Sequence, residues 1–128
     1  MIFGIGNDIV DVRRFAQVAA RFPQRFPRYI LTTQEQQQFA AKKMPLFFLA
    51  GRWAAKEALG KAIGCGVHTP LGFAQVGVCA DNAGKPQFTF ADSAIDFLKQ
   101  RGVGACHLSI SHDGNYAYAM VVAERKQE

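Results

Sequence analysis

Residues 52–64, RWAAKEALGKAIG, decide how the rest of the chain is interpreted. This Ala-rich stretch is typical of an α-helix that closes at Gly64. Trp53, Glu57 and Lys61 recur in steps of four, so their side chains should form one row along the helix. Such a row is either a surface ion pair, worth about 0.3 to 0.5 kcal/mol, or one wall of a site. Spacing alone favours the ion pair.

Length and composition predict one globular domain that spans residues 1–128. The chain is 49% hydrophobic and 20% charged, which suits a modest core. It contains no run of about 20 apolar residues and no start typical of a signal peptide, so we expect a soluble, cytoplasmic protein with no membrane partner. Cys65, Cys79 and Cys106 are odd in number and widely spaced, which argues against a disulfide framework and a zinc site.

The positive charge is concentrated in the first half of the chain. Residues 12–56 carry nine Lys or Arg residues against one acid, Glu35, a local balance of +8 within a net charge of +5. This excess points to an anionic partner: nucleic acid, a phosphate-rich small molecule or an acidic protein. A solvated basic face is the alternative. We find no nucleic-acid-binding motif, although Phe22, Phe26 and Tyr29 lie among the arginines.

Periodicity and turn residues predict the order strand, helices, strands, helix and hairpin. Thr32 and Glu35 fit a capping box, and Asp113-Gly114-Asn115 fits a hairpin turn. The expected elements are a strand at 2–7, a helix from about 11, a helix from 33 to 43, a long helix at 46–63, strands at 73–80 and 87–90, a helix at 92–101, and two final strands joined at 113–115. This order indicates an α+β fold with a mainly antiparallel sheet and one long central helix.

Asp8 is the first candidate site residue. The stretch GIGND at 4–8 begins like a dinucleotide fingerprint, but Ile9 stands where the third glycine belongs. We expect Asp8 at the end of a strand, with flanking glycines that allow a ligand to approach. A carboxylate there suits a hard cation such as Mg²⁺, which takes one or two carboxylates, waters and phosphates. The alternative is that Asp8 or Asp11 caps the next helix.

The long helix and the final hairpin supply the other candidates. Arg52 and Lys56 form a row beside the Glu57 row, so the helix could present a carboxylate to a metal and cations to phosphate oxygens. His112 ends a strand and could contact a phosphate, act as a base or stabilise the turn. Ser111, His112 and Asp113 are consecutive, so they cannot converge as a hydrolase triad.

Four stretches together resemble a known family. GIGNDIVDVRRF, FLAGRWAAKEALGKAIGCG, GKP at 84–86 and LSISHDGNYAYAMVVAE are similar to the holo-acyl-carrier-protein synthases, the small bacterial 4′-phosphopantetheinyl transferases, over essentially the whole chain. The resemblance implies their fold and their Mg²⁺-dependent reaction in fatty acid biosynthesis. In that reaction 4′-phosphopantetheine passes from coenzyme A to a serine of apo acyl carrier protein, releasing 3′,5′-ADP.

The resemblance also implies roles for individual residues. It implies Asp8 and Glu57 as Mg²⁺ ligands and catalytic residues, and Lys61 as the catalytic cation beside the phosphate. The segments that hold coenzyme A in relatives contain Arg52, Lys61, Gly64, Gly66, Pro86 and His112. The surface that docks the acidic carrier protein corresponds to Arg14, Arg25 and Phe26. Cys65, where Thr is common, and Asn7, where an apolar residue is frequent, depart from the pattern.

The resemblance implies a homotrimer whose sites lie between subunits, which would bring His112 to Asp8 and Glu57 of another chain. The general base stays open between Glu57, a metal-bound water, Glu35 and His112. Two rival functions remain: a non-enzymatic module that binds RNA or DNA, and a Mg²⁺-dependent phosphohydrolase. On the transferase interpretation neither nucleic acid nor a membrane is a partner.

Overall fold

The computed structural model describes residues 1–127 and has the α+β class expected from the sequence. The elements in chain order are β1 (Ile2–Asp11), α1 (Val12–Arg21), α2 (Arg25–Ile30), α3 (Thr33–Ala40), α4 (Pro45–Ile63), β2 (Val76–Ala80), β3 (Pro86–Phe90), α5 (Asp92–Gln100), β4 (Val103–Asp113) and β5 (Tyr116–Arg125). Within residues 1–127, none of the helices combines the length and apolarity needed to cross a membrane.

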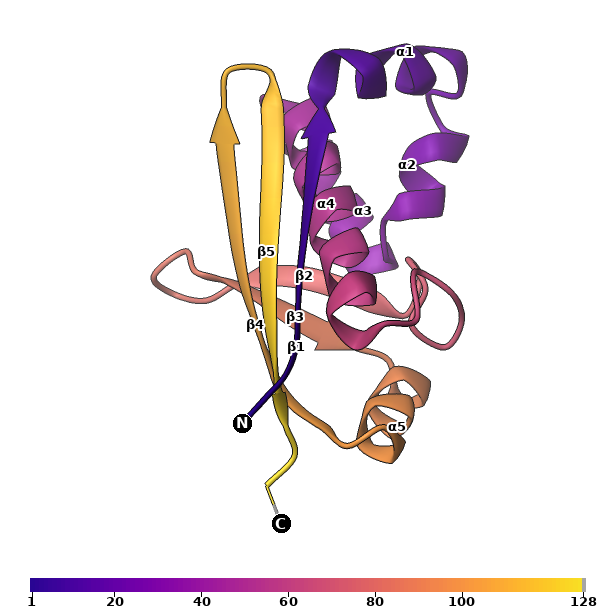
Figure 1. Cartoon of the computed structure of the whole chain (residues 1–128). Helices are drawn as coiled ribbons and strands as arrows, with labels where there is room; N and C mark the ends of the chain where they lie inside the picture. Colours follow the sequence, from indigo (N-terminus) through magenta and orange to yellow (C-terminus); the bar gives the residue numbers. More distant parts are fainter. Residues whose placement is uncertain (128) are drawn as a thin grey trace.

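Two antiparallel sheets and the long helix α4 make the framework. The larger sheet has the order β1-β5-β4, and β2 pairs with β3 in a second sheet that crosses behind its lower part (Figure 1). Helix α4 packs along the larger sheet, while α1 and α2 lie on the far side of α4 from β4 (Figure 1). The hairpin prediction is confirmed, since β4 and β5 join at Gly114, whose φ is 57°.

Helix α4 has clear start and stop signals and lies unusually close to β1. Pro45 occupies its first turn, and Gly64 ends it in the left-handed conformation, with φ 85°. A Cβ atom on Gly4 or Gly6 would collide with the α4 backbone, at Ala62 and Ala58 respectively. These glycines therefore let the helix reach the strand. The expectation that they make room for a ligand is wrong.

Strand β1 is longer than predicted and changes the place of Asp8. Pairing with β5 continues from Asp8, opposite Ala119, to Asp11, opposite Tyr116. Asp8 therefore lies within the strand and not at its end. Asp11 is the residue that caps α1, because its Oδ1 accepts a hydrogen bond from Arg13 N at 3.0 Å.

Other boundaries differ because local signals were incomplete. Pro23 and Pro27 interrupt the helical pattern, so the sequence predicts no helix here, yet Pro27 sits in the first turn of α2, where a missing N–H costs no helical hydrogen bond. The capping box at Thr32 and Glu35 is confirmed, but α3 ends at Ala40, short of the predicted residue 43. The strand expected from residue 73 begins at Val76, after a turn.

Candidate active site

The strand β1 and the helix α4 bring Asp8, Glu57 and Lys61 together. Alternation along β1 places Asp8 on the same face as Gly6, toward α4. Lys61 Nζ donates to the Asn7 carbonyl oxygen at 3.0 Å and to Asp8 Oδ1 at 3.2 Å. Within residues 1–127 no ion pair joins Lys61 to Glu57. The Glu57–Lys61 ion pair that spacing alone favours is therefore a wrong prediction, because Lys61 pairs with Asp8 of β1.

The electrostatics of this group favour a bound cation. Partial burial, and then the charge of Asp8, raise the pKa of Glu57, while Lys61 and His68 oppose the rise. The carboxylates of Asp8 and Glu57 thus lie near each other in partly buried positions, with the Lys61 ammonium group beside them. A divalent cation there would relieve their mutual repulsion.

The donor set fits a hard cation that keeps part of its hydration. Nowhere in residues 1–127 do three or more His, Cys, Asp or Glu side chains gather where they could hold a metal. Asp8 and Glu57 would then supply two ligands, and waters and substrate phosphates the rest. That is the usual arrangement for Mg²⁺, whereas structural zinc requires four protein ligands.

A cavity of about 420 Å³ opens beside this group and is lined by residues that include Asp8, Arg14, Phe15 and Trp53. Trp53 belongs to an aromatic cluster: its ring centroid is 5.7 Å from that of Phe15 and 4.8 Å from that of Phe73. Trp53 therefore forms a wall of the cavity by packing. Arg14, predicted to contact a carrier protein, lines the same cavity as Asp8.

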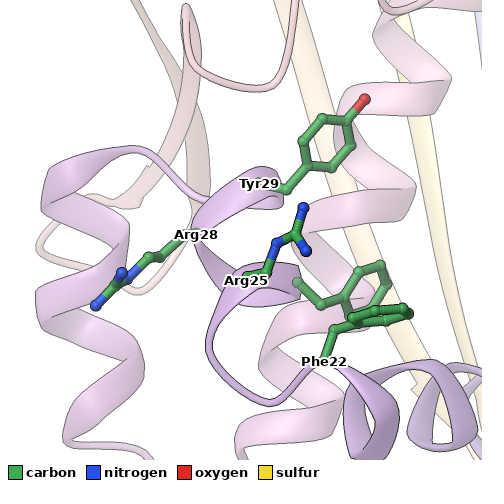
Figure 2. A pocket seen from close by; sticks show the side chains of 5 residues that line it. Phe22, Arg25, Arg28 and Tyr29 are labelled. Atoms are coloured by element: carbon green, nitrogen blue, oxygen red, sulfur yellow. The ribbon is translucent and has the colours of Figure 1, made fainter.

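A second cavity of about 520 Å³ lies over α2 and the end of α1. Its lining is Phe22, Arg25, Phe26, Arg28 and Tyr29. The Arg25 guanidinium lies between the Phe22 and Tyr29 side chains, and Arg28 extends to the other side (Figure 2). Arg25 and Phe26, predicted from the resemblance to belong to one docking surface, therefore do share a concave surface. Its mixture of cations and aromatic rings suits an acidic partner with apolar side chains.

The second row of α4 faces away from Glu57, contrary to expectation. Lys56 is only 2% exposed, and its Nζ lies 2.6 Å from Glu35 Oε1. Burial lowers the pKa of Lys56, against the opposing effect of Glu35. Lys56 is thus not available to phosphate oxygens. Glu35 is 1% exposed, so it is also removed from the candidate bases.

Arg52 stays a prediction as a coenzyme A contact. Its guanidinium lies 4.2 Å from the Phe48 ring centroid, and its Nε is 3.9 Å from Glu35 Oε2. That Nε is buried and makes no hydrogen bond within residues 1–127. Partial burial beside Glu35 was not readable from the sequence, because Glu35 lies on another helix.

The remaining predicted coenzyme A contacts are spread over the molecule. Gly64 and Gly66 both have positive φ and follow α4, where the Gly60 carbonyl accepts from three successive N–H groups. Pro86 begins β3. His112 is the next-to-last residue of β4, with Nε2 3.4 Å from the carbonyl oxygen of Phe47.

His112 and Glu57 lie at different levels of α4. His112 lies beside the first two turns of α4: its Nε2 is 3.4 Å from the Phe47 carbonyl oxygen, and a Cβ atom on Gly51 would be 3.3 Å from it. Glu57 lies 6 residues beyond Gly51, which is about 9 Å along the helix at 1.5 Å per residue. One chain therefore does not bring His112 to the carboxylates.

Comparison with known proteins identifies the family. Residues 4–121 match the family model of the 4′-phosphopantetheinyl transferase superfamily. The sequence is 44% identical, over 98% of this chain and 100% of the relative, to the holo-acyl-carrier-protein synthase of Nitrosomonas eutropha. The chain belongs to the holo-acyl-carrier-protein synthases. Both the resemblance and the expectation of an enzyme are thereby confirmed.

Solved structures of holo-acyl-carrier-protein synthases confirm the expected fold. The crystal structure from Neisseria meningitidis matches with a TM-score of 0.95 and 38% identity, over 98% of this chain and 100% of that one. The synthase from Bacillus anthracis, solved in complex with CoA (3′,5′-ADP), matches with a TM-score of 0.80 and 34% identity, over 98% and 99%. The long helix and antiparallel sheets are therefore those of the family.

Proposed function

We propose that this chain transfers 4′-phosphopantetheine from coenzyme A to a serine of apo acyl carrier protein, leaving 3′,5′-ADP, as a Mg²⁺-dependent step of fatty acid biosynthesis. The observation that carries the proposal is the meeting of Asp8, Glu57 and Lys61, with Asp8 also lining a cavity, in a chain of this family. The Bacillus anthracis relative binds CoA (3′,5′-ADP). All 128 residues would act as one transferase domain.

The chain's own groups have distinct tasks in this reaction. Asp8 and Glu57 would hold the cation, which when bound neutralises charge on the pyrophosphate of coenzyme A. Lys61 is held by the Asn7 carbonyl and by Asp8, so its ammonium group has a defined position beside the carboxylates. From there it would stabilise the phosphate oxygens that gain charge as 3′,5′-ADP departs. Glu57, with its raised pKa, and His112 remain candidates to accept the serine proton.

The basic first half of the chain has a matching partner in this proposal. Acyl carrier proteins are acidic, and Arg14 and Arg25 border the two cavities described above. Positive charges on α1 and α2 would steer the carrier protein toward Asp8 and orient its serine. Phe26 would supply an apolar contact to the same partner. Arg52, Gly64, Gly66 and Pro86 would contact coenzyme A.

We further propose a homotrimer with sites between subunits. The face of the larger sheet opposite α4 exposes a row of apolar side chains, with Ile5 61%, Ile9 63% and Met120 40% exposed. An apolar sheet face of this kind typically marks an interaction surface. A neighbouring copy would cover it and could bring its His112 to the carboxylate pair, which one chain alone does not do.

The three free cysteines suit a reducing compartment, which supports a cytoplasmic location.

A mass measurement tests the proposal. The protein is incubated with coenzyme A, Mg²⁺ and an apo carrier protein, and the carrier should gain the mass of one phosphopantetheine. Glu57→Gln should abolish the gain with the fold retained by circular dichroism. Glu124→Gln, the same change in an exposed pair with His107, is the matched control and should transfer normally.

Cleavage of coenzyme A without a labelled carrier would instead indicate a phosphohydrolase. Salt-sensitive nucleic-acid binding without transfer would indicate a binding module.

A further inference from the structure

Lys56 and Glu35 form a buried ion pair that no step of the proposed reaction uses. Their side chains are almost fully buried, and Lys56 Nζ lies 2.6 Å from Glu35 Oε1. Burying two charges costs desolvation free energy, and a well-packed apolar pair is often at least as stable. Stability alone therefore does not account for this pair. Its contacts suggest what else it does.

Lys56 holds two segments on the side of α4 away from β1. Its Nζ donates to the carbonyl oxygen of Ile30, the last residue of α2, at 2.7 Å. It also donates to the carbonyl oxygen of Phe73 at 3.1 Å. With Glu35 as the third acceptor, all three ammonium hydrogens have partners. The end of α2 is thus tied directly to α4.

Glu35 extends the same connection to two more elements. One oxygen, Oε1, accepts from Thr32 N at 2.9 Å at the start of α3. The other, Oε2, accepts from Val78 N of β2, also at 2.9 Å. The ion pair therefore joins α4 to α2, α3 and β2 through hydrogen bonds that each need a charged or polar partner. An apolar pair would make none of them.

The position of Lys56 gives this connection a functional meaning. Lys56 immediately precedes Glu57, so the anchor that limits rotation of α4 also sets the direction of the Glu57 carboxylate. On the opposite side, Gly6 lies against the α4 backbone at Ala58, on the strand that carries Asp8. The helix is therefore held from both sides at the level of Glu57.

The end of α2 that Lys56 anchors is next to the cavity of about 520 Å³ that lies over this helix. Arg25, Phe26 and Tyr29 of that helix line it, and Ile30 follows Tyr29 directly. A shift of the α2 terminus relative to α4 would move this surface relative to Glu57.

We propose that the Lys56–Glu35 pair is a positioning device that fixes the α2 surface relative to the Glu57 carboxylate. It sets where the serine of a carrier protein bound to α2 arrives. The inference rests on the proposed function, because it assumes that α2 docks the carrier protein. Neither residue touches substrate, so both act through Glu57 and α2.

Lys56→Met tests the inference, because it keeps the length of the side chain and removes the three donors. We expect the KM for the carrier protein to rise about tenfold or more and kcat to fall, with the KM for coenzyme A changed less than about twofold. Calorimetry should show the same loss of affinity for the carrier protein without turnover. Leu98→Ala, a cavity in the distant helix α5, serves as a control for lost stability.

Glu35→Gln is the second variant and decides the matter if Lys56→Met does not fold. It keeps the shape of the side chain but places an NH2 group where Oε2 accepts from Val78 N. The changes in KM and kcat should therefore be the same in kind as for Lys56→Met but smaller. If Lys56→Met and Glu35→Gln lose as much stability as Leu98→Ala and their KM and kcat values change no more than those of Leu98→Ala, that result would overturn the inference. Equal rises in both KM values would do so too. A wild-type protein that transfers nothing would instead overturn the proposed function.

Discussion

Gly6→Ala should disturb the site by moving a helix, although residue 6 touches no substrate. A Cβ atom at residue 6 would lie 2.7 Å from Ala62 N and closer still to the Ala58 carbonyl oxygen. Both atoms belong to the α4 backbone, which has no flexible side-chain end that could yield. Restoring ordinary contact distances of about 3.5 Å requires α4 and β1 to separate by on the order of 1 Å. Asp8 lies on β1 and Glu57 on α4, so the separation falls directly on the carboxylate pair.

The expected magnitudes follow from that separation. Overpacking costs about 1 to 3 kcal/mol, and the reduced entropy of the unfolded chain returns about 0.5 to 1 kcal/mol. A net loss of about 1 to 2 kcal/mol corresponds to a Tm about 4 to 8 °C lower for a domain of this size. Misplacing reacting groups by about 1 Å can cost about 100-fold in rate. We therefore expect a modest loss of stability and a large loss of kcat/KM.

Thermal unfolding by circular dichroism and steady-state transfer kinetics measure the two effects. Gly104→Ala is the matched control: it is also a strand glycine, but the atoms nearest to its Cβ would be the Arg125 carbonyl oxygen and the Lys126 Cα near the chain end, both at 3.2 Å. We expect it to leave both Tm and kcat/KM nearly unchanged. A Gly6→Ala protein that matches Gly104→Ala in both measurements would refute the idea that the close approach of α4 to β1 determines the relative position of Asp8 and Glu57.

Three further predictions follow from charge and exposure. The folded protein raises the Glu57 pKa, so its charge destabilises the fold above that pKa and the effect fades as protonation proceeds. In divalent-free buffer, Glu57→Gln should therefore raise Tm at neutral pH but not below the ordinary pKa of 4.5, and added Mg²⁺ should raise Tm only for wild type. Arg14→Glu should raise the KM for the carrier protein far more than that for coenzyme A; equal rises would contradict its docking role. Ile9→Asp should yield monomers by light scattering, and a persisting trimer would exclude this face as the interface.

Local signals were sufficient for most of the fold. The capping box at Thr32, the stop at Gly64 and the turn at Gly114 each act within a few residues, and all three lie where the sequence predicts them. Strand β1 was cut short because its last residues owe their extended form to pairing with β5. Helix α2 was missed because Pro27, a residue that usually interrupts a helix, lies in its first turn, where no helical hydrogen bond is lost. Sequence periodicity shows neither the strand pairing nor the position of a proline within its helix.

The sequence by itself determined the order of the elements apart from α2, the long helix and the family, because helix stops, turns and motif spacing are properties of neighbouring residues. Only the tertiary structure decided which partner each charge has. Lys61 pairs with Asp8 and not with Glu57, and Lys56 turns inward to Glu35. The physical reason is that spacing along a helix specifies which side chains share a face, whereas burial and ion pairing depend on the strand or helix packed against that face.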